Sequence, residues 1–155
     1  MSMENENLYK QEMVNKYRAA LGDLFRYISW FEQKQGQKSF QMYTGDNSPS
    51  QSVPIPVYDS TLLSFVKEMQ ATGLMDRNYQ YIYTRNRIGN MEDELAAIEH
   101  AGLKEIDVVM GILSKYVLGG MTKGVLWTQA VDGGIFLHAL LKMKDLLDIW
   151  DKPLA

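Results

Sequence analysis

The segment from Lys104 to Leu118 reads KEIDVVMGILSKYVL and is the most apolar stretch of the chain. Within it, Asp107, Gly111 and Ser114 recur at steps of four and three, which is the spacing of one face of a helix. A helix that is apolar over most of its circumference must be covered on several sides. The segment therefore predicts a helix buried in the core of the fold.

Two further helices are predicted after this segment. Gly119 and Gly120 supply the backbone freedom that ends a helix, and a shorter apolar run then extends from Val125 to Val131. After the turn at residues 132–134, apolar residues recur at alternating steps of four and three, with more apolar residues on both flanks of the stripe. The stripe consists of Phe136, Leu140, Met143, Leu147 and Trp150, and its flanks are Leu137, Leu141, Leu146 and Ile149. We expect three tightly connected helices that are stable only when packed on the rest of the chain.

A long first helix is predicted over residues 6–35, after a disordered N-terminus at residues 1–5. Apolar residues alternate along it at steps of three and four: Val14, Tyr17, Leu21, Leu24, Ile28 and Phe31. This seam resembles a heptad pattern, but it covers only about two and a half repeats, so packing within a bundle is favoured over a coiled coil. Trp30 points away from the seam and needs another partner.

Residues 36–57 do not have a helical pattern. Residues 44–50 are rich in turn formers, and Pro54 and Pro56 impose extended backbone on the residues before them. We expect an irregular or hairpin insertion near residues 38–57, packed over Trp30. The helical core then extends over residues 58–150.

Two more helices are predicted by their end signals. Asp59 or Ser60 caps a helix that ends at Gly73, and Asn90 caps a helix over residues 91–101. The first turn of the second helix contains Glu92, Asp93 and Glu94, which complement the exposed amides and are expected to be solvated.

The segment at residues 76–88 fits either a strand or a helix, because its tyrosines alternate while its other apolar residues lie at helical spacing. We favour a helix, since both neighbours are helical. The resulting prediction is a mainly α fold: a compact five- to six-helix single domain covering residues 1–155.

Composition excludes several classes of chemistry. The chain has no cysteine, which excludes thiol catalysis, disulfides and cysteine-ligated metals. The N-terminal residues are polar, and charged residues interrupt the most apolar region, so we expect neither a secretory signal nor a membrane span. A net charge of −3 argues against broad binding to nucleic acid. We therefore expect a cytoplasmic protein that binds no nucleic acid and no membrane.

No motif for a cofactor, a metal or a catalytic centre is present. The two histidines, His100 and His138, lack the spacing that places two ligands on one helix face. The glycine-rich loop at residues 119–124 could receive an anion, but Thr122 as a cap of the following helix is the simpler interpretation. We predict no cofactor and no metal, and an enzyme is disfavoured.

A group of arginines and tyrosines is the candidate ligand or anion site. It consists of Arg77, Tyr79, Tyr81, Tyr83, Arg85 and Arg87. Guanidinium groups beside phenol rings can hold a carboxylate, a phosphate or a stacked base. Alternatively, the rings are partly buried and the arginines pair with neighbouring acidic residues.

The second half of the chain resembles a family of small helical bacterial proteins known only as a domain of unknown function. The resemblance rests on Tyr58-Asp59, Gly73-Leu74-Met75, Asn78-Tyr79-x-Tyr81, Gly124-Val125-Leu126-Trp127, Asp132-Gly133-Gly134-Ile135-Phe136-Leu137 and Leu140-Leu141-x-Met143. It extends over residues 57–147. Residues 119–123 depart from the family pattern, which has charged residues there. The resemblance implies a bacterial cytosolic helical domain and brings no activity with it.

The leading hypothesis for function is a non-catalytic protein–protein interaction module that self-associates as a homodimer. Surplus aromatic and methionine residues and the heptad-like first helix supply apolar area for such a contact. The candidate interface residues are Val14, Tyr17, Leu21 and Trp30. The alternative is a small-molecule or nucleotide-binding protein that uses the arginines and tyrosines.

Overall fold

The apolar segment that begins at Ile106 forms helix α6 (Ile106–Gly119), and most of its side chains are buried. A computed structural model describes residues 3–37 and 59–151, and every regular element in these ranges is helical. Five helices pack against α6: α3 (Ser60–Ala71), α4 (Tyr79–Arg85), α5 (Met91–His100), α7 (Val125–Asp132) and α8 (Ile135–Asp151). The prediction of a helix covered on several sides is confirmed.

The thin polar line along α6 faces protein rather than water over most of its length. Only Asp107 is exposed. A Cβ atom added at Gly111 would lie 3.0 Å from the side chain of Ile82 in α4. Ser114 Oγ accepts a hydrogen bond of 2.8 Å from the backbone amide of Asp76. The small and polar residues of α6 therefore mark its close contact with α4 and with the segment that precedes α4.

The N-terminal region is helical but not a single helix. It consists of α1 (Met3–Leu21), the 3₁₀ helix η1 (Gly22–Tyr27) and α2 (Ile28–Gln37). The structure thus differs from the continuous helix predicted over residues 6–35, and α1 begins within the stretch expected to be disordered. Gly22 is a poor helix former and stands where α1 ends. A 3₁₀ helix has three residues per turn, so Leu24 and Tyr27 both reach the core.

The apolar seam of this region faces the interior of the same chain. Val14, Leu21, Leu24 and Phe31 are buried. The expectation that the seam packs within a bundle is confirmed. Phe31 also belongs to a group of three mutually contacting rings, with centroids 4.8 Å from Phe65, 5.6 Å from Phe136 and 5.0 Å between the last two.

The helix ends follow the predicted signals. Asp59 caps α3 by accepting a 2.8 Å hydrogen bond from Thr61 N, and Asn90 caps α5 by accepting one of 2.8 Å from Asp93 N. Gly73 and Gly134 have φ values of 74° and 82°, in the left-handed region that glycine adopts most easily. The loop or hairpin expected near residues 38–57, and its packing on Trp30, lie outside the described residues.

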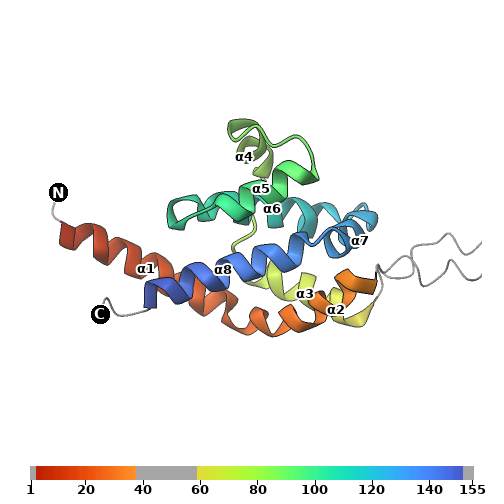
Figure 1. Cartoon of the computed structure of the whole chain (residues 1–155), viewed down its shortest axis with the longest axis horizontal. Helices are drawn as coiled ribbons and strands as arrows, with labels where there is room; N and C mark the ends of the chain where they lie inside the picture. The colour runs from red at the N-terminus through yellow and green to blue at the C-terminus, as the bar shows by residue number, and fades with distance from the viewer. Residues whose placement is uncertain (1–2, 38–58, 152–155) are drawn as a thin grey trace, which may run out of the picture.

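Helix α8 packs against both the N-terminal helices and the C-terminal ones. It contacts α1 and α2 on one side and α5, α6 and α7 on the other. In Figure 1, α8 runs through the middle of the body, between α1–α3 and the layer of α5 and α6, with α4 outermost. The prediction of a mainly α single domain is confirmed. In the described ranges, no helix has the length and apolar character needed to cross a membrane.

Candidate functional site

The arginine and tyrosine segment forms a helix, α4, as favoured from the sequence, but its side chains do not meet in one pocket. Tyr83 points inward, and its hydroxyl donates a 2.6 Å hydrogen bond to the carboxylate of Glu94. Tyr81 is 56% exposed, and its hydroxyl accepts a 2.9 Å hydrogen bond from Arg85. Arg85 also pairs with Asp107 at 2.7 Å. The sequence alternative, in which the rings are partly buried and the arginines pair with neighbouring acids, fits Tyr83 but fits Arg85 only in part, because its partner Asp107 lies in α6.

Two of the remaining members of this group, Arg77 and Tyr79, lie with Tyr81 around a hollow. Arg77, Tyr79 and Tyr81 line about 440 Å³ of space beside α4. Arg87 is exposed, lies outside this hollow and has a left-handed φ of 56°. The six candidate residues therefore do not form one site: one points inward, one makes an ion pair, and the others lie on the open surface.

A buried carboxylate cluster lies where α5 meets α6. Glu94 is 0% exposed, although its place in the first turn of α5 led us to expect a solvated side chain. Its carboxylate accepts hydrogen bonds from Tyr83 at 2.6 Å, Tyr116 at 2.5 Å and Lys115 at 2.9 Å. The expectation for Glu94 was wrong because α5 packs on α6 at this turn, which no local pattern in α5 indicates.

The same cluster perturbs the titration of its two tyrosines. Burial raises the pKa of the Tyr83 hydroxyl well above its ordinary value of 10.0, and the hydrogen bond to Glu94 raises it further. Tyr116 has a raised pKa for the same two reasons. Both hydroxyls stay protonated as donors, so Glu94 is held by three donors at once. This network of hydrogen bonds stabilises the α5–α6 contact, and the carboxylate at its centre is closed off from solvent.

The candidate interface residues of the first helix lie mainly inside the monomer. Val14 and Leu21 are both 0% exposed, so neither offers surface to a second chain in this fold. Tyr17 and Trp30 are half-buried. The Trp30 ring packs edge-on against Phe31, with centroids 5.2 Å apart. Trp30 therefore finds within the chain the partner that the sequence pattern required.

Most amides of the glycine-rich loop between α6 and α7 already donate to carbonyl groups of α6. The amides of Thr122 and Lys123 both donate to the carbonyl oxygen of Gly119, at 3.2 Å and 3.0 Å. The hydroxyl of Thr122 donates to the same oxygen at 3.2 Å. Thr122 therefore closes the end of α6, whereas we expected it to cap α7.

The histidines do not form a metal site with their neighbours. Among the described residues, no group of three histidine or acidic side chains is placed to hold a metal ion. His100 and His138 are both exposed, and Nδ1 of His138 lies 2.7 Å from the carbonyl oxygen of Gly134. Because that oxygen can only accept, Nδ1 is the donor of this hydrogen bond.

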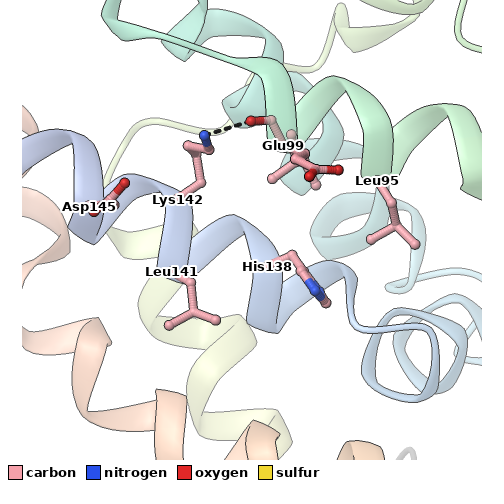
Figure 2. A pocket seen from close by; sticks show the side chains of 7 residues that line it. Leu95, Glu99, His138, Leu141, Lys142 and Asp145 are labelled. Carbon is pink, nitrogen blue, oxygen red and sulfur yellow. Dashed lines mark hydrogen bonds between the residues drawn. The ribbon is translucent and has the colours of Figure 1, made fainter.

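A groove between α5 and α8 is the surface feature that combines apolar and polar groups. It encloses about 530 Å³. Its lining includes three aliphatic residues, Leu95, Ile98 and Leu141, and four polar ones, Glu99, His138, Lys142 and Asp145. Figure 2 shows His138, Leu141, Lys142 and Asp145 following one another along α8, with Leu95 and Glu99 on α5.

One hydrogen bond joins the two walls of this groove. Lys142 Nζ donates at 2.7 Å to the backbone oxygen of Glu99 (Figure 2). Carbonyl groups in the last turn of a helix lack partners within the helix, so the ammonium group satisfies one of them at the end of α5. The bond fixes the spacing of α5 and α8 and uses only one of the three donors of Lys142.

The sequence pattern did not reveal the groove. We expected Leu141 to extend the buried stripe of α8, but it is 38% exposed. His138, Leu141, Asp145 and Asp148 recur at steps of three, four and three, and this second stripe on α8 was the available signal. It was hidden because α8 is apolar on most of its other faces.

Within the described residues, the groove is characterised chemically by its hydrogen bonds. It contains no nucleophile in contact with a base, and its single hydrogen bond between elements uses a backbone oxygen. The groove combines aliphatic and charged side chains from two helices, and Lys142 reaches across it to α5.

The comparisons with known proteins add no relative. No protein-family model matches the chain, and neither the curated proteins nor the solved structures give a match. The resemblance to a bacterial family therefore remains a prediction.

Proposed function

We propose that this protein is a non-catalytic protein–protein interaction module that self-associates, and that the groove between α5 and α8 is its contact surface. The observation that supports the proposal is the open groove with Leu95, Ile98 and Leu141 in its lining. The cytoplasmic location and bacterial source expected from the sequence remain part of the proposal.

Physical considerations favour binding to a protein over binding to a small polar molecule. Aliphatic side chains on an open surface gain free energy when a partner removes them from water, in proportion to the area covered. The lining mixes aliphatic residues with polar groups from both helices, as a protein interface does. Helix–helix packing also needs no deep cavity, and the groove is open to solvent.

The test is the molar mass of the protein in solution, measured by light scattering after size exclusion over a range of concentrations. We expect the wild type to have a mass above that of a monomer, and Leu141→Glu to shift it to a monomer. Leu63→Glu is the matched control, because Leu63 on α3 is 37% exposed and Leu141 is 38% exposed. A wild-type protein that remains monomeric at the highest concentration contradicts the proposal.

The second candidate is small-molecule or nucleotide binding beside α4, which is supported by Arg77, Tyr79 and Tyr81 around one hollow. The probe is adenosine monophosphate, titrated into the protein in a calorimeter. This candidate predicts heat of binding that is lost in Arg77→Ala and kept in Arg18→Ala. Equal results for the two variants, or no heat with the wild type, remove it.

A further inference from the structure

The solvent-facing side of α8 carries an ordered set of charges. We call this side the α8 outer face, and it consists of His138, Leu141, Lys142, Lys144, Asp145 and Asp148. The remaining described side chains of α8 are buried, so the outer face is the side that the monomer leaves uncovered. Lys142 and Lys144 precede Asp145 and Asp148 along the helix.

This order of charges is unfavourable for an isolated helix. The C-terminal end of a helix carries a partial negative charge and favours cations, yet the last turn of α8 has no basic residue and contains Asp148. The ion pair of Lys144 with Asp148, at 3.2 Å, has the lysine first, which is the weaker order for residues four apart. Asp145 makes no ion pair with any residue in the described ranges.

A second copy of α8 lying antiparallel to the first would make these charge interactions favourable. An antiparallel neighbour places the acidic C-terminal half of each outer face against the basic half of the other. The two charge patterns are then complementary, and both helix dipoles are opposed. The contact is also isologous, because each pair of residues occurs twice about a two-fold axis.

We propose that two copies of this chain associate through an antiparallel pair of α8 helices, related by a two-fold axis at the level of Met143. The proposal rests on the self-association proposed above and adds its geometry. In this register, position 141 of one copy faces position 145 of the other, and position 138 faces position 148. Positions 138, 141, 145 and 148 follow one another at steps of three, four and three, so they lie along one side of the helix and form a continuous line of contact.

The register brings specific side chains together. Leu141 of one copy approaches Leu141 of the partner subunit across the axis, near the half-buried Leu95, whereas Ile98 is already buried in the monomer. Lys142 lies on the edge of the seam beside Asp145 of the partner subunit. Its ammonium group has donors to spare beyond the bond to Glu99, so it can join the two copies without releasing α5.

Charge complementarity favours a second copy over an unrelated helix as the occupant. A partner for this face needs an anion opposite Lys142 and a cation opposite Asp145, at the same separation along the helix. An antiparallel α8 supplies both because it carries the same two residues in reverse order. The unpaired Asp145 then gains an ion pair in a surface that is partly removed from water.

Charge reversal tests this geometry by sedimentation velocity. Lys142→Glu alone places two carboxylates together twice in the dimer, and Asp145→Lys alone places two ammonium groups together twice. We expect each single variant to raise the dissociation constant of the dimer about 100-fold, since like charges across an interface are strongly unfavourable. A mixture of the two single variants, and the double variant carrying both changes, should each regain a dimer close to the wild type.

Two controls separate pairing from damage to the fold. Lys67→Glu makes the same change of charge at an exposed position of α3 and should leave the dimer unchanged. Lys142→Gln loses the bond to Glu99 without adding a negative charge, so it should weaken the dimer less than Lys142→Glu does.

The outcomes separate the proposal of self-association from the proposal of an antiparallel α8 pair. A wild-type dimer that both single reversals leave intact, or a mixture that stays monomeric, overturns the antiparallel register while self-association stands. Dissociation of the wild type and of every variant into monomers at all concentrations overturns both.

Discussion

Two regions of this molecule contain a lysine and a carboxylate, but the carboxylate is buried in one region and exposed in the other. In the Glu94 cluster, Lys115 lies 2.9 Å from a carboxylate that is 0% exposed. On the α8 outer face, Lys142 and Asp145 lie three positions apart, and Asp145 is exposed without an ion pair in the described ranges. The carboxylate of the first region is buried, whereas that of the second is exposed and can be reached by a partner.

The difference follows from the cost of burying charge. A carboxylate removed from water must be matched by donors within the fold, or the desolvation penalty is not offset. Glu94 has three such donors, from α4 and α6, and so links the two helices to α5. The charges of α8 pay no such penalty in the monomer, and they become partly buried only if a partner covers them. We therefore expect changes in the first region to act on stability and changes in the second to act on association.

The largest effect is expected for Glu94→Ala. This change leaves the ammonium group of Lys115 and the hydroxyls of Tyr83 and Tyr116 without their acceptor. The free energy of unfolding should fall by roughly 3–5 kcal/mol, as for other buried ion pairs that lose one partner. Denaturation in urea measures it, with Glu92→Ala in the same helix turn as the control. A loss no larger than that of the exposed Glu92 would show that the cluster is not buried in solution.

The next largest effect is on stability at alkaline pH. The pKa values of Tyr83 and Tyr116 are raised in the folded state above the ordinary value of 10.0. Above pH 10 the unfolded chain therefore releases protons that the folded chain keeps. This contribution is fully present below pH 10 and is lost as the pH rises, by up to about 1.4 kcal/mol per pH unit for each tyrosine.

Urea denaturation at pH 8 and at pH 11 measures this loss. The variant with phenylalanine at both positions, Tyr83→Phe with Tyr116→Phe, should lose less stability than the wild type over the same interval. Equal losses would mean that these hydroxyls titrate normally in the folded protein.

A smaller effect is expected for Tyr116→Phe alone at neutral pH. The carboxylate of Glu94 loses one of its three donors in a site without water access, which should cost about 1–3 kcal/mol. Tyr81→Phe is the matched control, because the Tyr81 hydroxyl is on the surface and its loss should be nearly neutral. Similar unfolding free energies for the two variants would contradict the distinction between the regions.

The smallest effect on stability is expected for Asp145→Asn, together with a clear effect on association. An exposed side chain without a partner in the described ranges should change the free energy of unfolding by less than about 0.5 kcal/mol. The dissociation constant of the dimer should rise about tenfold, since two ion pairs with Lys142 are lost. Unfolding at concentrations where the protein is monomeric, compared with sedimentation, separates these quantities. Lower stability of the monomer with an unchanged dissociation constant would contradict the view that Asp145 acts on association.

Much of the fold could be predicted from periodicity and caps, because both are local. The buried faces of α6 and α8, the cap at Asn90 and the turn at Gly73 each depend on residues close together in sequence. The break at Gly22 could not be predicted in the same way. Steps of three and four fit an α-helix, and a single step of three also fits a 3₁₀ turn, so the apolar seam continues through η1 without a visible change.

The sites were less predictable because they depend on which helices meet. Glu94 looks like any acidic residue in a first helix turn, and only its contact with α6 buries it. Leu141 fits the apolar flank of α8, and only the position of α5 leaves it at the edge of a groove. The six residues of the arginine and tyrosine group lie close in sequence. Successive residues of a helix point in different directions, so their side chains lie on different sides of α4.

The most direct test of the central claim, that two α8 helices pair antiparallel, is disulfide formation between two variants. The chain has no cysteine, so Leu141→Cys and Asp145→Cys each introduce a single thiol. In the proposed register, positions 141 and 145 of opposite copies fall within the Cα separation of roughly 4.4–6.8 Å that a disulfide allows. We predict that an oxidised mixture, with one variant carrying a longer tag, gives mainly the mixed dimer on a denaturing gel. A mixed dimer no more abundant than that of Asp145→Cys with Leu63→Cys would contradict the account.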